Sequence, residues 1–412
     1  LIMAGHDISA GGLITTLLEM CFSNMEGGME INLNKIKEND IIKILFAENP
    51  GIVIQVKDKD KAEVKKILED AGIGYVKLGT PTDERHILVN KEDATYQFGI
   101  DYLRDVWYST SYLLDRKQSM NGCAKKRFEN YKEQPLEFVF DKSFTGKFSQ
   151  YGITPERRTP TGIKAAIIRE KGTNGEREMA YMLYLAGFDV KDVTMTDLIS
   201  GRETLEDINM IVFCGGFSNS DVLGSAKGWA GAFLFNPKAK AALDNFYARK
   251  DTLSLGVCNG CQLMIELGLI NPEHNKKAKM LHNDSHKFES KFVGVTVPMN
   301  RSVMLGSLSG SKLGIWVAHG EGKFSLPYEE DKYNVVLKYS YDEYPGNPNG
   351  SDYSVAGLAS SDGRHLAMMP HLERSCFPWQ NAYYPSDRIN KDQVTPWIEA
   401  FVNARKWVEM NK

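Results

Sequence analysis

The chain has 412 residues, more than one ordinary hydrophobic core accommodates, so we expect at least two domains. Hydrophobic residues make up 42% and charged residues 25%, which is usual for globular proteins. The formal net charge is -3 and no basic stripe interleaves with aromatic residues, which argues against nucleic-acid and membrane partners. No apolar stretch reaches the roughly 18–20 residues that a membrane-spanning helix needs.

The six cysteines are sparse and unevenly spaced. This pattern favours reduced thiols in a cytoplasmic enzyme over a disulfide scaffold. No signal peptide is present, and the chain opens at Leu1 without Met and runs at once into an apparently interior motif, Ala4–Leu13. We therefore expect a cytoplasmic location and a natural N-terminus upstream of Leu1.

Residues 1–106 are expected to form a first, α+β domain. Its glycine-rich segment His6–Leu13 leads into a helix, and the amphipathic pattern of charged and apolar residues over Lys59–Ala71 predicts a second helix. The predicted elements are helices over Ile14–Cys21 and Lys59–Ala71 and strands over Ile52–Val56 and His86–Val89.

Residues 107–160 are predicted to form a linker. Lys, Ser, Asn, Gln and aromatic residues dominate, and periodicity is weak apart from one helix over Trp107–Leu114. Such a length without strong elements is more typical of an interdomain connection than of a loop.

Residues 161–412 are predicted to form an α/β domain with a mostly parallel, flavodoxin-like sheet covered by helices on both faces. Strands alternate with helices up to about residue 268, and later strands follow one another without helices, which indicates an antiparallel extension. The predicted strands are Ile163–Arg169, Phe188–Val193, Ile208–Phe213, Thr252–Val257 and, in the extension, Phe292–Pro298, Ile315–Ala318, Val335–Tyr339, Ser354–Ala359 and His365–Met369; the predicted helices are Glu176–Gly187, Pro237–Arg249, Gly260–Gly268 and Trp397–Val408.

The segment Gly256–Gln262 has the pattern of a nucleophile elbow, a sharp turn between a buried strand and a helix. Glycines two residues before and after Cys258 avoid collisions in such a strained turn. The N-terminus of the following helix favours a thiolate at Cys258 and leaves the Asn259 N–H free to face an oxyanion.

Two other interpretations of Cys258 compete. A buried structural cysteine is common, although glycines at a strand–helix junction make it much less frequent. Cys258 and Cys261 also have the spacing of a redox pair or of half a zinc site. No second such pair and no zinc-type histidine pair exists, and a redox role gives no function to Gly256 or Gln262.

A thiol nucleophile needs a base and a group that orients the base. His371 follows an apolar strand, and Glu373 lies two residues later, on the same side of an extended segment. We expect Glu373 to fix the imidazole of His371 beside Cys258. A surface pair is the competing interpretation of the spacing alone. Among the other glycine turns, Cys214–Asp221 ends a sheet strand and is a source of a second oxyanion donor, and Lys171–Gly175 is a structural or substrate-lining turn.

These residues together resemble the class I, or triad, glutamine amidotransferases. More narrowly, the whole chain resembles the C-terminal part of the family of large, single-chain phosphoribosylformylglycinamidine (FGAM) synthases. The carrying segments are Gly256–Gln262, Cys214–Trp229, Ala318–Gly322, Asn347–Ser351 and Met368–Arg374, with His6–Leu13 resembling a signature of AIR-synthetase-like domains. Two positions depart from the pattern: Ala10 stands where relatives often carry an acidic residue, and Leu372 stands where Pro is expected.

The resemblance implies that Cys258, His371 and Glu373 hydrolyse glutamine and pass ammonia to an upstream synthetase. That synthetase converts formylglycinamide ribonucleotide (FGAR) to FGAM with ATP and Mg²⁺, which makes the complete protein a ligase of purine biosynthesis. For this chain, glutamine is the implied ligand and no cofactor or metal is expected. The further implied site residues are Gly216 and Asn259 for the oxyanion and Gln262, Phe217 and His319 for the substrate.

Two alternatives from other classes stay open. A cysteine peptidase or other thiol hydrolase uses the same elbow and His–Glu spacing, but it needs an open cleft instead of a small pocket. A non-catalytic interaction module would leave Cys258 inert to iodoacetamide.

Overall fold

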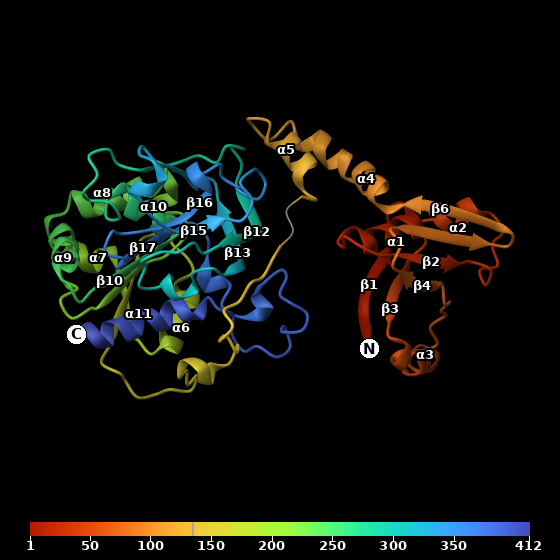
Figure 1. Ribbon diagram of the computed structural model, residues 1–412, viewed down its shortest axis with the longest axis horizontal. Helices are drawn as coiled ribbons and strands as arrows, with labels where there is room; N and C mark the ends of the chain where they lie inside the picture. Colours follow the sequence, from red (N-terminus) through yellow and green to blue (C-terminus); the bar gives the residue numbers. More distant parts are fainter. Residues whose placement is uncertain (134–135) are drawn as a thin grey trace. The chain divides into compact units, whose positions relative to one another are not determined.

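A computed structural model describes residues 1–133 and 136–412 of the chain. It divides into two compact units, Leu1–Lys117 and Gln118–Lys412, each with its own hydrophobic core (Figure 1). Gln134 and Pro135, which fall within the predicted linker, lie outside the described residues.

The first unit is an α+β structure. Helix α1 buries Leu13, Ile14 and Leu17 against strands β2 and β5, whose side chains Ile31 and Ile87 point into the same core. One sheet has the order β4-β2-β5-β6, and a second consists of the antiparallel pair β1 and β3. The bounds are β1 Ile2–Ile8, α1 Gly12–Phe22, β2 Gly28–Asn32, α2 Ile41–Phe46, β3 Gly51–Val56, α3 Lys61–Asp70, β4 Gly79–Thr82, β5 His86–Lys91, β6 Ala94–Gly99 and α4 Ile100–Asp115.

Among its described residues, the segment predicted as a linker contains the second half of one α-helix, a complete second α-helix and the short 3-10 helix Phe148–Tyr151. The predicted helix at Trp107 is the second half of α4, which begins at Ile100 directly after β6. Helix α5 (Cys123–Asn130) belongs to the second unit, where Cys123 is buried. Residues 138–144 also add aromatic side chains to the second unit, in which Phe138 and Phe140 pack against Tyr384.

The second unit is built around a nine-stranded sheet with the order β13-β12-β15-β16-β17-β10-β9-β7-β8. Five neighbouring strands pair in parallel: β8, β7, β9, β10 and β17. Antiparallel pairings continue the sheet from β17 through β16, β15 and β12 to β13. The predicted α/β class, with a mostly parallel flavodoxin-like part and an antiparallel extension, is confirmed. The bounds are β7 Lys164–Arg169, β8 Asp189–Thr194, β9 Met210–Phe213, β10 Leu253–Val257, β12 Glu289–Thr296, β13 Lys312–His319, β15 Asn334–Tyr339, β16 Val355–Ala359 and β17 His365–Met368, with a small separate pair of β11 Lys279–Leu281 and β14 Lys323–Ser325.

Strand β17 was assigned to the antiparallel extension from the sequence, and this assignment is wrong. It pairs in parallel with β10 and closes the parallel half of the sheet. The chain leaves the sheet after β10, builds the antiparallel strands and then returns beside β10. Sequence order could not reveal the return, because no helix directly precedes β17.

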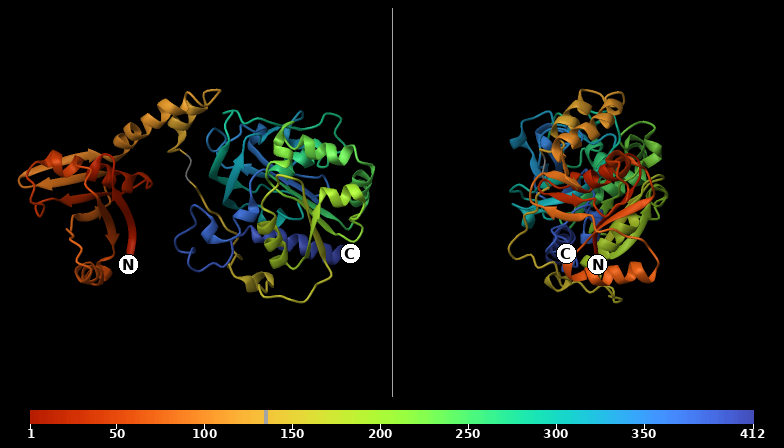
Figure 2. Two further views of the ribbon diagram at one scale, coloured as in Figure 1. Left: turned by 180° about the vertical axis from the view of Figure 1, so that it is seen from behind. Right: turned by 90° about the vertical axis from the view of Figure 1, so that its right-hand side faces the viewer.

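Helices cover both faces of the parallel half (Figure 2). α6 and α11 pack together on one face, while α7, α8, α9 and α10 form a contiguous layer on the other. Strands β9 and β10 are completely buried between these layers, as expected for the centre of a parallel sheet. The bounds are α6 Glu176–Ala186, α7 Met195–Ser200, α8 Lys227–Leu234, α9 Pro237–Ala248, α10 Asn259–Glu266 and α11 Ile398–Asn411.

Candidate functional site

The site begins at the junction between β10 and α10. Cys258 lies between them with φ 54° and ψ -108°, a conformation that L-residues rarely adopt. Such backbone strain costs on the order of 1–3 kcal/mol and persists only where the surroundings enforce it. The turn presents the thiol at the C-terminal end of the strand and at the N-terminus of the helix, as the elbow pattern predicts.

The two glycines of the elbow are required by close contacts. A Cβ on Gly256 would lie 2.5 Å from the carbonyl oxygen of Gly260 and 2.6 Å from Sδ of Met264. A Cβ on Gly260 would lie 2.0 Å from the carbonyl oxygen of Phe213, on the neighbouring strand. The steric reason for both glycines, expected from the sequence, is therefore present.

His371 and Glu373 reach the elbow because β17 is the parallel neighbour of β10. The N–H of Cys258 donates to the carbonyl oxygen of Met368, 2.9 Å away, and three residues later the chain places His371. The side chain of His371 lies with Nδ1 2.6 Å from Oε1 of Glu373. Cys258, His371 and Glu373 are 5%, 2% and 1% exposed, so all three groups are buried together.

The charge of Glu373 governs the protonation of His371. Burial alone lowers the pKa of the imidazole, but the negative charges of Glu373 and of a Cys258 thiolate outweigh burial and raise this pKa to about 10. The site therefore favours the imidazolium form of His371. Arg374 lies near the same carboxylate, with Nε 3.7 Å from Oε1 of Glu373.

Gly215, at the end of β9, leaves the space that Cys258 and His371 share. A Cβ on Gly215 would lie 2.8 Å from Cε1 of His371 and 3.4 Å from Cβ of Cys258. The sequence singled out the glycine turn Cys214–Asp221 as a source of an oxyanion donor, but not this steric role. Any larger residue would push the imidazole away from the thiol.

Two backbone N–H groups near Cys258 remain available. Gly216 has φ 120°, and within the described residues neither its N–H nor that of Asn259 donates to an acceptor. The glycine turn is held by the predicted turn Lys171–Gly175, because Asn174 N–H donates to Gly215 O and Phe217 N–H donates to Gly172 O, both at 2.9 Å. The arrangement leaves unpaired N–H groups on both segments that border the thiol.

The side chain of Asn259 has a role that the sequence did not reveal. Its Oδ1 accepts from Ser218 N–H at 3.0 Å, and its Nδ2 donates to Oε1 of Gln262 at 2.8 Å and to Asp221 at 3.2 Å. The elbow is thereby fastened to the glycine turn. The only sequence signal was the polar character of a residue that opens a buried helix.

The three predicted substrate residues lie in different settings. Gln262 is buried, and its amide is engaged with Asn259 and with the carbonyl oxygen of Glu321, 2.7 Å away. Phe217 is 47% exposed and packs against Phe288 with ring centroids 5.9 Å apart. His319 is buried at the end of β13, directly after Ala318, whose carbonyl oxygen lies 3.5 Å from Sγ of Cys258. All three thus border the elbow or the segments bonded to it.

The sequence did not reveal the role of Glu321 or the backbone strain at the end of the glycine turn Cys214–Asp221. Asn219, Ser220 and Asp221 have successive φ values of 52°, 56° and 48°. The carboxylate of Glu321 accepts hydrogen bonds from both the N–H and the hydroxyl of Ser225, and so ties the end of this segment to the turn Ala318–Gly322. Burial and the nearby charge of Glu321 raise the pKa of Asp221. The acidic residue in Ala318–Gly322 was a visible signal, but its partner could not be identified from the sequence.

The remaining cysteine and metal interpretations find little support. Cys261 is fully buried, and burial raises its pKa well above the usual value, so its thiol is not poised for exchange. Among the described residues, no group of three or more His, Cys, Asp or Glu side chains could hold a metal ion. No helix of the described part is long and apolar enough to cross a membrane.

A central parallel sheet with a strained cysteine between strand and helix defines an α/β protein of the nucleophile-elbow class. The chain belongs to the family described as CobB/CobQ-like glutamine amidotransferase domain, which matches residues 162–408. Residues 1–90 match a second family, described as AIR synthase related protein, C-terminal domain.

Curated relatives match almost the whole chain. A probable phosphoribosylformylglycinamidine synthase, chloroplastic/mitochondrial, from Arabidopsis thaliana is 38% identical over 435 residues, covering 99% of this chain and 30% of the relative. Phosphoribosylformylglycinamidine synthase from Homo sapiens is 39% identical over 439 residues, covering 99% of this chain and 32% of the relative. The predicted resemblance to these synthases is confirmed, and the chain spans about a third of the length of the curated relatives it matches.

A solved structure, that of PurLQS from Thermotoga maritima, is 28% identical in sequence. The match has a TM-score of 0.45 and covers 60% of this chain and 99% of that chain.

Proposed function

We propose that the second unit hydrolyses glutamine to glutamate and ammonia, with Cys258 as nucleophile, His371 as proton carrier and Glu373 as the group that orients His371. One observation carries the proposal: the strained Cys258 and the bonded pair His371–Glu373 meet at one buried site, in the space left by Gly215. The match of the glutamine amidotransferase family to the same region supports glutamine as the substrate.

The proposed reaction has two stages. Sγ of Cys258 attacks the side-chain amide carbon of glutamine, and the C–N bond breaks after His371 gives a proton to the nitrogen, which leaves as ammonia. Because Nδ1 of His371 faces Glu373, Nε2 is the nitrogen that exchanges the proton. Water, deprotonated by His371, then hydrolyses the glutamyl thioester to glutamate and restores the thiol.

The oxyanion of each stage needs donors that are already in place. We assign this role to the N–H groups of Gly216 and Asn259, because both border the thiol and neither has an acceptor within the described residues. Gln262, Phe217 and His319 are proposed to line the glutamine pocket. The proposed role of Gln262 is mainly to fix the turn Ala318–Gly322 beside the pocket, because both its amide oxygen and its amide nitrogen already form hydrogen bonds within the protein.

In the complete protein we propose that this chain is the glutaminase part of FGAM synthase in de novo purine biosynthesis. Its ammonia would pass to an upstream, ATP-dependent synthetase that converts FGAR to FGAM, and ATP and Mg²⁺ would bind there. The relatives are about three times as long as the matched region, which supports such an upstream part. A cytoplasmic location belongs to the same proposal.

A peptidase or other thiol hydrolase is less well supported. An extended peptide needs an open groove at the nucleophile, whereas Cys258, His371 and Glu373 are almost completely buried. A non-catalytic module gives no reason for a strained cysteine next to a charged His–Glu pair.

Glutamate release from glutamine tests the proposal. The chain and its Cys261→Ala variant should release glutamate, and Cys258→Ala should release none. Turnover of peptides but not of glutamine would favour the peptidase instead. Supplied with FGAR, MgATP and ammonium, the chain alone should form no FGAM, because none of its glycine-rich segments has the Lys-Ser/Thr ending of a phosphate-binding loop.

A further inference from the structure

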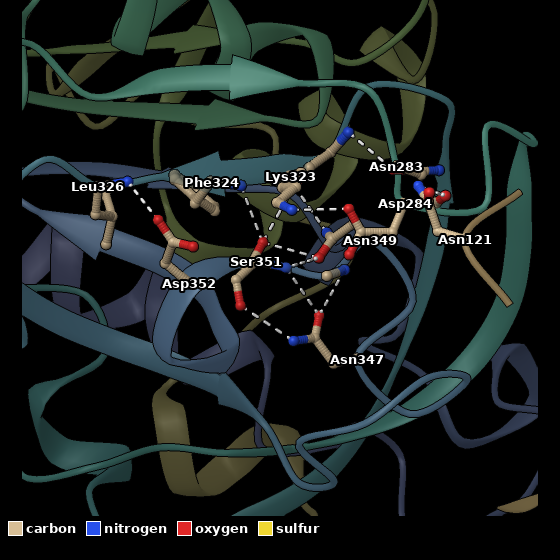
Figure 3. A network of polar contacts seen from close by, with 12 residues as sticks. Asn121, Asn283, Asp284, Lys323, Phe324, Leu326, Asn347, Asn349, Ser351 and Asp352 are labelled. Atoms are coloured by element: carbon tan, nitrogen blue, oxygen red, sulfur yellow. Dashed lines mark hydrogen bonds and ion pairs between the residues drawn. The ribbon is translucent and has the colours of Figure 1, made fainter. Parts of the chain in front are cut away.

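A network of buried amide side chains lies against the turn that follows β13 (Figure 3). One member of this network, Asn283, is fully buried and uses its whole hydrogen-bonding capacity. Its Nδ2 donates to the carbonyl oxygens of Lys287 at 2.9 Å and His319 at 2.7 Å. Its Oδ1 accepts from Gly322 N–H at 3.0 Å and lies 3.2 Å from Nδ1 of His319.

These contacts determine where His319 carries its proton. Nδ2 of Asn283 faces two carbonyl oxygens, so the orientation of the amide is fixed by chemistry and Oδ1 can only accept. Nδ1 of His319 must therefore be the protonated nitrogen. Burial lowers the pKa of His319 to about 3, helped by the positive charge of His371, so the ring is neutral. Nε2 then holds a lone pair, and it is buried without a hydrogen-bond partner among the described residues.

The turn Ala318–Gly322 is clamped from both sides. Gly322 donates its N–H to Asn283, and its carbonyl oxygen accepts from Nδ2 of Asn349 at 2.7 Å. The carbonyl oxygen of Glu321 accepts from Gln262, on the helix that begins at the nucleophile. The turn therefore has one set position relative to Cys258.

A second segment holds the residues next to Asn283. Nδ2 of Asn121 donates to the carbonyl oxygen of Asp284 at 2.8 Å (Figure 3). Met120 N–H donates to the carbonyl oxygen of Ser285 at 3.0 Å. Both donors lie just before helix α5, in the segment Gln118–Asn130. This segment directly follows the first unit in the chain.

We propose that Asn283 is a positioning residue for glutamine hydrolysis, which sets the turn Ala318–Gly322 and the tautomer of His319, and that Met120 and Asn121, just before helix α5, control its position through their bonds to Ser285 and Asp284. The inference rests on the proposed function and extends it. It makes the capture of glutamine depend on a segment that touches neither the nucleophile nor its base.

Two reagents applied to the 412-residue chain separate positioning from chemistry. Diazo-oxo-norleucine must enter the glutamine pocket to reach Cys258, whereas iodoacetamide reports only the reactivity of the thiol. In Asn283→Ala the rate at which the glutamine analogue modifies Cys258 should fall about 10-fold or more, because several hydrogen bonds to the turn Ala318–Gly322 are lost. The rate of iodoacetamide at Cys258 should stay within about twofold, and KM for glutamine should rise more than kcat falls.

A milder pair of variants covers the case in which Asn283→Ala does not fold. Asn121 has φ 53°, so Asn121→Gly removes the hydrogen bond without adding backbone strain. It should slow the analogue roughly 2- to 10-fold, as loss of one neutral hydrogen bond permits. The matched control is Asn130→Ala, which removes a similar bond to the carbonyl oxygen of Tyr344, 3.0 Å away, and should leave the rate unchanged.

The outcomes are distinct. Selective slowing of the analogue in Asn121→Gly but not in Asn130→Ala supports the inference. An unchanged analogue rate in Asn121→Gly, or equal slowing of both reagents, overturns it. Failure of the unmodified chain to react with the analogue at all overturns the proposed function itself.

Discussion

The two halves of the large sheet make different contributions to the site. The parallel half supplies the proposed reacting groups, because Cys258 follows β10 and His371 follows β17, while Gly215 after β9 leaves the space that both occupy. The antiparallel half supplies no reacting group but places His319 and its turn as a wall beside them. The proposed reacting groups thus follow parallel strands, whereas this wall of the pocket follows an antiparallel strand.

The difference follows from strand direction. Parallel strands all end at one edge, so residues that directly follow each strand must converge there. Antiparallel strands end at alternate edges, and they meet the site through individual contacts, such as that of the carbonyl oxygen of Ala318 with Sγ of Cys258 and those of Asn283 with the turn after β13. Changes in the parallel half should therefore affect kcat, and changes in the antiparallel half should affect KM.

The largest effect is expected from His371→Ala. Removal of the proposed proton carrier at Cys258 should lower kcat for glutamine hydrolysis roughly 10²- to 10⁴-fold, the usual contribution of general acid–base catalysis. The variant His86→Ala, in the first unit, is the control and should retain activity. A wild-type kcat in His371→Ala would show that His371, and with it this strand end of the parallel half, takes no part in the reaction.

Glu373→Gln should be milder, because an amide oxygen still accepts from Nδ1 of His371. The negative charge that raises the pKa of His371 is lost, so this pKa falls. The imidazolium then deprotonates at lower pH, and the basic limb of the kcat profile should move down by roughly one to two pH units.

Glu178→Gln provides a matched control for this shift. Oε1 of Glu178 also lies 3.7 Å from Nε of Arg374, but within the described part of the chain Glu178 makes no hydrogen bond or ion pair with His371. An equal shift in both variants would mean that the basic limb of the kcat profile depends on the summed charge around Arg374 and not on the contact between Glu373 and His371. The double variant His371→Ala/Glu373→Gln should lose little more than His371→Ala alone, because the two residues act as a unit.

The elbow can also be tested through stability. Gly260→Ala would press a methyl group onto the carbonyl oxygen of Phe213 and should lower the free energy of unfolding by about 1–3 kcal/mol. Gly231→Ala, inside α8, meets only ordinary contacts and should be neutral or stabilise by about 0.5–1 kcal/mol. Denaturant unfolding measures both, and equal destabilisation would contradict the steric account of the elbow.

The smallest effect concerns the opposite end of β17. His365 is buried with Nδ1 2.9 Å from Oγ of Ser254, and burial, with the charge of Arg364, lowers its pKa to about 4. The unfolded value is about 6.5, so the unfolded chain binds more protons between these pH values, and stability falls as pH decreases from about 6.5 to 4. His365→Asn should flatten this slope by up to about 1.4 kcal/mol per pH unit and leave the slope above pH 7 unchanged.

The parallel half of the site could be predicted because its signals are local. Gly256–Gln262 and Met368–Arg374 each contain a strand end and its functional residues, and the fold only has to place the strands side by side. The parallel placement of β17 was missed because its partner β10 is separated from it by the whole antiparallel extension.

The pocket wall formed by His319 and the turn Ala318–Gly322 could not be predicted, because its residues are held by contacts between segments that are distant in the sequence. Asn283 lies in an undistinguished polar stretch, and only the structure brings it to His319. Strand β1 was missed for the same reason: its residues resemble a glycine-rich loop until β3 pairs with them. Helix α8 was hidden within the segment Cys214–Trp229, whose resemblance to the family drew attention to its glycines.

The most direct measurement is the identification of the residue that carries the glutamyl group during turnover. The chain is mixed with isotope-labelled glutamine, quenched in acid, digested and mapped by mass spectrometry. We expect a labelled glutamyl thioester on Cys258, lost in Cys258→Ala and retained in Cys261→Ala. A label on Cys261, or glutamate release that continues in Cys258→Ala, would contradict this expectation.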